Sequence, residues 1–331
     1  MTIEAFDRVD LDGTGIDRIT EDEVVAVVRE SLAYGRGGRI ITPNVDILRR
    51  ASADPSVRRH LDDADLIVAD GMPLIWASRL GGAPLPERVA GSSLIWSLSE
   101  GLGRDARSIF VIGGTPIASG ALKGAKSAAI RTAEAGRGTV RTAGTKSAAA
   151  GIKSATAGVG GAAAGVGGAT AGVGGGAAGR SGGTVKVGGV KGIRDGAMRA
   201  ATRLARECPG LRIAGTLSPP FGFEEDEGAY GALCDEVVAA EPDMVFVGLG
   251  FPKQELVIER LRPYLPGAWF VGCGAAVNFV AGDIERAPRW MQRTGLEWAH
   301  RLGVEPRRLA GRYLRHDAPY ALRLLARARR R

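Results

Sequence analysis

The chain has little of what marks exported, membrane-spanning or zinc-binding proteins. Its three cysteines, Cys208, Cys234 and Cys273, are far apart and form no Cys-x-x-Cys pair, so neither a disulfide framework nor a zinc site is indicated. No run of 18 or more apolar residues is present, and residues 1–13 lack the basic-then-apolar pattern of a signal peptide. Aromatic residues make up only 5% of the 331 residues, but 45% are apolar, which is ample for a large α/β core. We therefore expect a cytoplasmic protein that is large enough to be an enzyme.

The net charge of +8 is unevenly distributed along the chain. Residues 117–200 carry 12 Lys and Arg against two acidic residues, and residues 301–331 carry ten Arg against two. The remaining residues therefore have ten more acidic than basic side chains. Because the positive charge lies in two appendages of an acidic body, we expect no nucleic-acid partner.

Residues 117–194 differ from the rest of the chain. Of residues 117–200, 45 are Gly or Ala, and the heptapeptide A-(T/A)-A-G-V-G-G occurs three times in tandem at 155–175. Glycine costs about 1 kcal/mol per position in a helix, and there is no Leu/Ile seam, so the repeat does not predict a coiled coil. We interpret 117–194 as a flexible, low-complexity insertion. A surface expansion without function is the favoured interpretation, and a basic tether for anionic lipid or polymer is the alternative.

Outside this segment, predicted strands and helices alternate. Thr20 and Glu23 form a capping box that opens the first helix, which is expected to run to Tyr34. Strands are expected at 39–42, 65–70, 108–114, 211–215, 243–247 and 268–274. Helices are expected at 45–63 (a pair), 72–80, 91–102, 195–207, 224–240, 288–302 and 305–330, with one more following the strand at 243–247.

This alternation predicts a Rossmann-like α/β fold, with a mostly parallel sheet and helices on both faces. We divide the chain into a catalytic α/β domain (1–116 and 195–285), the insertion (117–194) and a C-terminal, Arg-rich helical appendage (286–331).

The segment GLGFPKQE at 248–255 joins the apolar run 243–247 to an amphipathic stretch. A strand, a glycine turn and a helix start in this order present backbone N–H groups and a positive helix end, which favour phosphate binding. Pro252 suits the first helical turn. The third glycine of a dinucleotide fingerprint is missing, and no Gly-Lys pair exists for a P-loop, so an ordinary turn stays an open alternative. The residues of this segment that we expect at the site are Gly248, Gly250, Lys253, Gln254 and Glu255.

Polar residues and glycines also follow other predicted strands. Doubly wound sheets bind ligands at the carboxyl ends of their strands, so these residues are expected to converge on one site. They are Thr42, Asn44, Asp70, Gly71, Gly113 and Gly114.

Asp70 is the candidate general base. It ends an apolar strand and precedes Gly71, so its carboxylate should project into the crevice, where partial desolvation would make it a usable base. The alternative, equally favoured by the sequence, is that Asp70 caps the helix beginning near Met72. No second carboxylate lies at a comparable position, which disfavours a two-carboxylate glycosidase. Asp10-Leu11-Asp12 has the form of an Asp-x-Asp metal motif, but its place in an amphipathic strand and turn near the N-terminus disfavours a metal, and we expect no metal or cofactor.

Seven segments, in order, resemble the WecG/TagA/CpsF glycosyltransferase family. They cover nearly the whole chain except the insertion: ITPNVDIL (41–48), ADLIVADGMPLIWASR (64–79), RVAG (88–91), FVIGG (110–114), PGLRIAG (209–215), VGLGFPKQE (247–255) and RAPRWMQRTGLEWAHRLGVEPRRLAGRY (286–313).

The resemblance implies transfer, with inversion, of a hexose from a UDP-sugar to a lipid-diphosphate-linked N-acetylglucosamine, for cell-surface polysaccharide or teichoic-acid-type synthesis. The typical sugar in this family is N-acetylmannosamine. The resemblance gives Asp70 the role of base, and it implies that Thr42 and Asn44 line the acceptor side while Arg88 and Gln254 contact the donor. It also implies that C-terminal arginines complete the pocket over the diphosphate, at Arg301, Arg308 and Arg312, with the choice among 307, 308 and 312 left open.

The appendage also fits a lipid-linked acceptor. Residues 305–331 interleave leucines and Tyr313 with many arginines, a pattern typical of a helix on an anionic membrane surface. A helix packed on the protein body is the alternative. We expect peripheral association with the inner face of the plasma membrane. A different class of function, a non-enzymatic polyanion-binding or scaffold protein, would explain the two basic segments but not the polar residues at the strand ends.

Overall fold

The computed structural model describes residues 6–116 and 195–330, without the side chains of residues 289, 293 and 308. The insertion predicted at 117–194 lies outside these residues, so its interpretation stays a prediction. Within the described residues, the three cysteines are free and buried.

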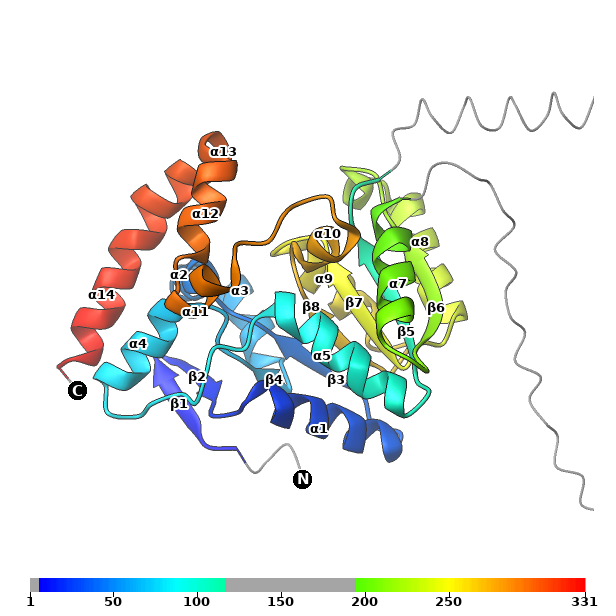
Figure 1. The fold of residues 1–331 in the computed structure, drawn as a ribbon, viewed down its shortest axis with the longest axis horizontal. Helices are drawn as coiled ribbons and strands as arrows, with labels where there is room; N and C mark the ends of the chain where they lie inside the picture. Colours follow the sequence, from blue (N-terminus) through cyan, green and yellow to red (C-terminus); the bar gives the residue numbers. More distant parts are fainter. Residues whose placement is uncertain (1–5, 117–194, 331) are drawn as a thin grey trace, which may run out of the picture. The chain divides into compact units, whose positions relative to one another are not determined.

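A six-stranded parallel sheet forms the centre of the fold, with the strand order β4-β3-β8-β7-β5-β6 (Figure 1). All six predicted strands are present, which confirms the predicted α/β class. Their bounds are β3 (Gly38–Ile41), β4 (Leu66–Ile67), β5 (Ser108–Gly113), β6 (Arg212–Leu217), β7 (Met244–Gly248) and β8 (Trp269–Gly272).

Strand β4 has two residues, although a strand was predicted over 65–70. The chain nevertheless stays beside β3 after Ile67, because the Val68 N–H donates to the Ile41 carbonyl and the Asp70 N–H donates to the Pro43 carbonyl, each at 3.0 Å. These two bonds carry Asp70 past the end of the sheet, next to the segment that follows β3.

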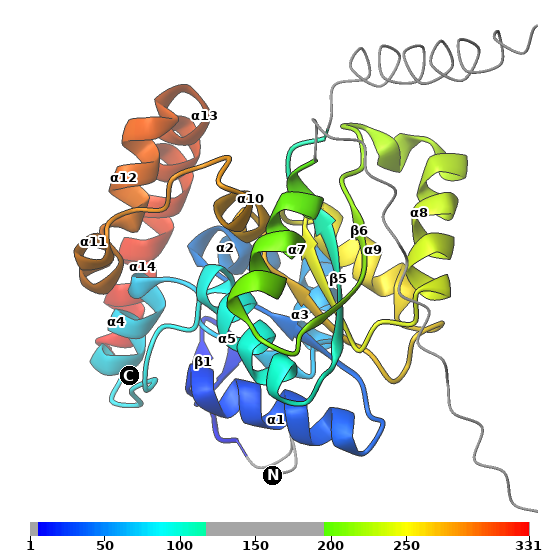
Figure 2. The same cartoon turned by 45° about the vertical axis from the view of Figure 1, so that its right-hand side comes forward.

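Side chains alternate between the two faces of the sheet, as apolar strands buried on both sides require. In β7, Met244 and Phe246 pack into one core, and Val245 and Val247 pack into another. The first core is closed by α1 (Glu21–Ala33), α5 (Gly91–Arg104), α7 (Gly196–Glu207) and α10 (Ala276–Ala281). The second is closed by α8 (Glu227–Ala239) and α9 (Lys253–Leu261), and Figure 2 separates α5 and α7 from α8.

A third core lies beside β3 and β4. It joins the antiparallel hairpin of β1 (Arg8–Leu11) and β2 (Thr14–Asp17) to the helices α2 (Val45–Ala53), α3 (Pro55–Asp62), α4 (Met72–Leu80) and α14 (Ala318–Ala328). The last helix of the chain therefore packs on elements from its first quarter.

Most helices agree with their predicted ranges. The Thr20–Glu23 capping box is formed, with the Glu23 N–H donating to Thr20 Oγ1 at 3.2 Å and the Thr20 N–H donating to Glu23 Oε2 at 2.8 Å. The helix predicted over 224–240 is divided into a short 3-10 turn, η2 (Phe223–Glu225), and α8, because Asp226 caps α8 through the N–H groups of Gly228 and Ala229. Helix α10 was not predicted, since six residues are too few to show a helical period.

The C-terminal appendage is more broken than the two long helices predicted at 288–302 and 305–330. It consists of α11 (Arg289–Thr294), α12 (Glu297–Val304), α13 (Pro306–Ala310), the π-helical segment η3 (Gly311–Asp317) and α14. Gly295 separates α11 from α12 in a left-handed conformation, with φ of 80°. A Cβ there would lie 2.5 Å from the Met72 side chain, so the break lets the appendage approach α4 closely. No helix in the described residues is long and apolar enough to cross a membrane.

Candidate active site

The residues predicted to converge lie along the carboxyl edge of the sheet, but not all at one place. Thr42 and Asn44 follow β3, and Asp70 follows the neighbouring strand β4. The segment 248–255 follows β7, and β8 separates it from β3. Gly113 and Gly114 lie one strand further out, after β5. Thr42, Asn44 and Asp70 therefore lie close to one another, after two neighbouring strands. Gly113, Gly114 and the segment 248–255 lie at the other half of this edge.

Thr42 and Asn44 have partners within the protein. Asn44 is the N-cap of α2, and its Oδ1 accepts a hydrogen bond from the Ile47 N–H at 3.2 Å. Thr42 is buried, and its hydroxyl donates to the Gly272 carbonyl at 3.4 Å, a long hydrogen bond. Both side chains are thus held at the ends of β3 and β8 rather than extended into solvent.

Asp70 does not cap the helix that follows it. Gly71 occupies the N-cap position of α4, and no side chain caps that helix. Instead, the Asp70 carboxylate accepts from the Gly91 N–H at the start of α5. This arrangement excludes the capping alternative and leaves Asp70 partly accessible to solvent at the sheet edge.

The surroundings of Asp70 raise its pKa above the ordinary value. Burial is the largest cause, and the negative charge of Glu297 acts in the same direction. Arg88, Arg301 and the Gly91 N–H oppose this effect without cancelling it. A carboxylate with a raised pKa binds a proton more tightly, which is the property required of a general base.

Arg88 lies in the connection between α4 and α5 and forms an ion pair with Glu297. Its Nη1 is 3.1 Å from Glu297 Oε2, and both side chains are mostly buried. Arg286 joins the same cluster, with its Nε 3.9 Å from Glu297 Oε1 and its Nη1 donating to the Ser92 carbonyl at 3.2 Å. Burial lowers the pKa of Arg286.

No second carboxylate was expected at a strand end beside Asp70, and the one that acts on its pKa, Glu297, comes from α12. Glu297 was missed because it comes from the appendage and not from a strand end. Arg286 was missed for the same reason, although both residues lie inside the segment 286–313 that carries the family resemblance.

A surface pocket of about 550 Å³ opens beside Arg88. Three arginines and two glutamates line it, and α5 begins at its wall without a side-chain cap, so the positive end of this helix adds to the excess of positive charge. This combination favours an anionic ligand. The lining residues are Glu21, Met72, Ile75, Arg79, Pro86, Glu87, Arg88, Ser93, Arg286 and Gln292.

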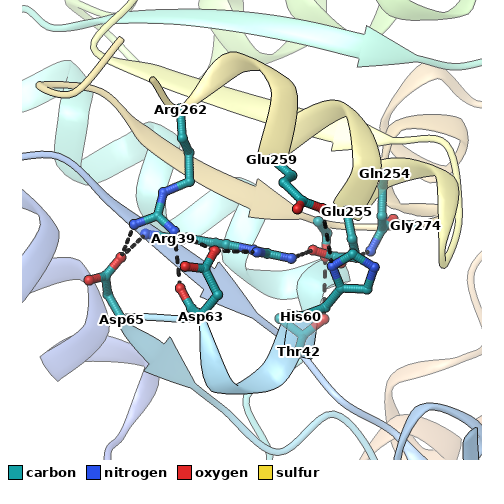
Figure 3. Close-up of polar contacts among 11 residues, drawn as sticks. Arg39, Thr42, His60, Asp63, Asp65, Gln254, Glu255, Glu259, Arg262 and Gly274 are labelled. Atoms are coloured by element: carbon teal, nitrogen blue, oxygen red, sulfur yellow. Dashed lines mark hydrogen bonds and ion pairs between the residues drawn. The ribbon is translucent and has the colours of Figure 1, made fainter. Parts of the chain in front are cut away.

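The segment 248–255 forms the predicted strand end, turn and helix start. Some of its side chains are exposed to solvent, and others are buried inside the protein. Pro252 precedes α9 instead of lying in its first turn. Lys253 is exposed and forms an ion pair with Glu224. Gln254 is buried, with its Oε1 accepting from the Gly274 N–H at 3.0 Å and its Nε2 donating to Glu255 Oε1 at 2.9 Å (Figure 3).

Glu255 is fully buried and pairs with Arg39, whose Nη2 is 2.7 Å from Glu255 Oε2 (Figure 3). Gln254 and Glu255 therefore build the interface between α9 and the sheet. Contact of Gln254, Glu255 and Lys253 with a ligand stays a prediction.

The predicted glycines have packing roles that their sequence position did not specify. A Cβ on Gly113 would lie 2.6 Å from the Gly248 carbonyl oxygen, and one on Gly114 would lie 2.6 Å from the Gly196 carbonyl carbon. A Cβ on Gly248 would lie 2.5 Å from Val277. A Cβ on Gly250 would meet no other atom, but its φ is 79°. Glycine is therefore favoured at this position by the backbone conformation and not by packing.

Of the predicted C-terminal arginines, Arg301 joins the site. It acts on the pKa of Asp70, and its guanidinium carbon lies 5.1 Å from the centre of the Phe279 ring. Arg312 instead faces Asp317, with its Nε 3.6 Å from Oδ2. The side chain of Arg308 lies outside the described part of the structure, so its role stays a prediction.

The Asp-x-Asp motif lies at the β1–β2 turn. Asp12 accepts a hydrogen bond from the Tyr320 hydroxyl at 2.7 Å and forms an ion pair with Arg327. Its carboxylate thus ties the hairpin to α14. Among the described residues, no group of three or more His, Cys, Asp and Glu is arranged to hold a metal ion.

A parallel α/β sheet with a half-buried acid, an amide and several arginines at its carboxyl edge has the features of a transferase acting on phosphorylated substrates. Comparison with known families agrees, because the model of the glycosyl transferase WecG/TagA/CpsF family matches residues 9–166 and 177–331. The chain belongs to this family, and it is a glycosyltransferase.

Two curated relatives have the same name, N-acetylglucosaminyldiphosphoundecaprenol N-acetyl-beta-D-mannosaminyltransferase. The chain is 26% identical to the protein of that name from Bacillus spizizenii strain W23 over 277 residues, covering 84% of this chain and 75% of the relative. It is 36% identical to the one from Bacillus subtilis strain 168 over 105 residues, covering 32% of this chain and 39% of the relative.

Proposed function

We propose that the protein transfers N-acetylmannosamine from a UDP-sugar to an N-acetylglucosamine carried on a lipid diphosphate, with inversion. The names of its two relatives support this acceptor and this sugar. The single structural observation that carries the proposal is the position of Asp70, whose carboxylate lies at the carboxyl edge of the sheet among Arg88, Arg301 and the start of α5. Such a site combines one base with several cations.

Asp70 acts as the general base. The acceptor hydroxyl oxygen forms a bond to the anomeric carbon of the donor sugar, while the bond from that carbon to the β-phosphate oxygen of UDP breaks. The hydroxyl proton passes to the Asp70 carboxylate, and the electron pair of the broken bond leaves with UDP. Thr42 and Asn44, next to Asp70 across β3 and β4, lie on the acceptor side.

Arginines and the start of α5 stabilise the departing UDP. Negative charge builds up on its diphosphate as the bond breaks, and donors that are already positioned lower the energy of that state. Arg88 and Arg286 line the pocket beside α5, and the charge of Arg301 on α12 lowers the pKa of Asp70. These groups supply the required positive potential from the chain itself.

The appendage binds the membrane surface that holds the lipid-linked acceptor. Large apolar side chains are exposed on it, and many arginines are interleaved with them along the sequence. A helix surface of this composition inserts its apolar side chains between anionic headgroups. The exposed residues are Trp290, Leu296, Trp298, Val304, Leu314 and Leu322. The protein then works at the inner face of the plasma membrane.

The experiment that tests this proposal measures UDP release from UDP-N-acetylmannosamine with a lipid-diphosphate-linked N-acetylglucosamine. We expect turnover with the wild-type protein, and a loss of at least about 100-fold in Asp70→Asn with an unchanged circular dichroism spectrum. Other UDP-hexoses serve as competing donors in the same assay. Equal turnover in Asp70→Asn contradicts the base assignment, and no turnover with any donor favours the alternative, a non-enzymatic polyanion-binding protein.

A further inference from the structure

Arg88 interacts electrostatically with two carboxylates, those of Glu297 and Asp70, but it forms an ion pair only with Glu297. Its Nη1 lies 3.1 Å from Glu297 Oε2. In the part of the chain that the structure describes, Asp70 forms no ion pair within 4.0 Å, although Arg88 influences its charge. Arg88 is thus held by the appendage, and none of the described side chains forms a salt bridge with the Asp70 carboxylate.

Glu297 is well placed to hold Arg88. It lies in the first turn of α12, where a carboxylate is stabilised by the positive end of the helix. Only 13% of its side chain is exposed, and 15% of that of Arg88. An ion pair with so little solvent around it is screened weakly and holds its geometry better than a surface pair.

Several charged groups of the described residues act on the Asp70 carboxyl group or on its neighbours. Arg88 approaches from the connection between α4 and α5, Glu297 and Arg301 from α12, and Arg286 from the connection before α11. The Gly91 N–H at the start of α5 donates to the carboxylate. Among the described groups that act on the pKa of Asp70, Glu297 is the carboxylate, and it both binds Arg88 and adds a negative charge.

We propose that Glu297 is a positioning residue that holds Arg88 away from Asp70, so that the Asp70 carboxylate stays free to accept the proton of the acceptor hydroxyl. This inference rests on the proposed function of Asp70. Without the charge on Glu297, Arg88 is free to pair with Asp70. Such a pair stabilises the ionised carboxylate and makes it a weaker base.

The first test is the pH dependence of turnover in Glu297→Gln. We expect the acidic limb of the kcat profile to move down by about one pH unit, because an unpaired arginine nearby lowers the pKa of a carboxylate by one to three units. We expect kcat on the plateau to fall by roughly tenfold or less, with a smaller change in the KM for the acceptor. Glu297→Asp keeps the charge and should restore the position of the limb.

The matched control is Glu236→Gln. Glu236 is an exposed carboxylate on α8, which packs against the other half of the sheet. We expect its kcat profile to match that of the wild type. If Glu297→Gln lowers kcat equally at every pH, the role of Glu297 is structural and the inference is overturned.

A second measurement does not depend on turnover. The pKa of the Asp70 carboxyl group is followed by carbon-13 NMR in protein with labelled aspartate, and the signal is assigned by its loss in Asp70→Asn. We expect this pKa to fall in Glu297→Gln and to rise in Arg88→Gln, which removes the cation and leaves Glu297 in place. An unchanged or higher pKa in Glu297→Gln overturns the inference, and if that variant does not fold, an unchanged or lower pKa in Arg88→Gln does so.

The two measurements separate the inference from the function on which it rests. If the pKa of Asp70 shifts as expected but Asp70→Asn retains full turnover, then the base assignment fails and the influence of Glu297 on the Asp70 carboxyl group stands. If the pKa does not shift while Asp70→Asn is inactive, then the base assignment stands and the role proposed for Glu297 fails.

Discussion

Arg39 and Glu255 form an ion pair of 2.7 Å in which neither side chain is exposed (Figure 3). Arg39 belongs to β3 and Glu255 to α9, so the pair joins the start of one strand to the helix that follows another. Gln254 donates to the same carboxylate and accepts from the Gly274 N–H. A carboxylate oxygen accepts hydrogen bonds. The amide of Gln254 is therefore oriented with its Nε2 toward Glu255 and its Oε1 toward the Gly274 N–H.

Replacing Glu255 by Ala should lower the free energy of unfolding by about 3–5 kcal/mol. The change leaves Arg39 as a buried cation that has lost its buried partner, and its remaining partner, Asp63, is half exposed. Urea denaturation measures the loss. The control is Glu100→Ala, which breaks the exposed pair with Arg104 and should cost less than about 1 kcal/mol. Similar losses in the two variants would show that the buried pair contributes little.

Alanine at Gly113 should destabilise the protein, whereas alanine at Gly231 should stabilise it. A Cβ at Gly113 would lie 2.6 Å from the Gly248 carbonyl oxygen, at a φ of 123° that L residues rarely adopt. Gly231 lies within α8 with open space around it, where alanine is worth up to about 1 kcal/mol more than glycine. Thermal unfolding of the two variants checks the opposite signs. A stable Gly113→Ala would mean that β5 and β7 can separate without cost.

Asp70→Asn should be more stable than the wild type at pH 7, although we expect it to be inactive. The pKa of Asp70 is raised in the folded protein, so the ionised carboxylate costs stability as the pH rises above the ordinary value of about 3.9. Below that value the group is protonated in both states, and the difference should vanish. Unfolding midpoints measured from pH 3 to pH 8 test this trend, with the exposed Asp235→Asn on α8 as control. A wild type that is more stable than Asp70→Asn at pH 7 would contradict it.

Leu322→Glu should weaken binding to vesicles that contain anionic lipid. Leu322 is 68% exposed on α14, and the change replaces an apolar contact by a charge that anionic headgroups repel. Co-sedimentation with vesicles measures binding, and raised salt should reduce it for the wild type as well. Phe221→Glu is the control, because Phe221 is 93% exposed but lies outside the appendage. Equal losses in the two variants would remove the appendage as the membrane-binding surface.

The fold and the grouping of Thr42, Asn44 and Asp70 follow from local patterns. Apolar runs bounded by turn residues identify all six strands, and in a parallel sheet their order along the chain places Thr42, Asn44 and Asp70 at one edge. The same logic identifies the strand, turn and helix start at 248–255. These predictions depend on short stretches of chain, which the sequence reports directly.

The features that the sequence did not predict depend on contacts between segments that are far apart in the chain. Glu297 reaches Arg88 across 209 residues, and Arg39 reaches Glu255 across 216. A sequence shows the charges of these residues but not their pairing. Gln254 illustrates the difficulty, because its place at a helix start suggests a ligand contact, whereas tertiary packing buries it against Glu255 and Gly274.

The hydrogen bond from Tyr320 to Asp12 joins residues that are 308 positions apart. A contact between residues so far apart in the sequence forms late in folding, after most of the chain is ordered, because closing a long loop is slow. The β1–β2 hairpin is the first described element to leave a ribosome, yet it gains this partner only when α14 has been made. The third core therefore joins the first and the last elements that the structure describes, and it can close only after the residues between them have been made.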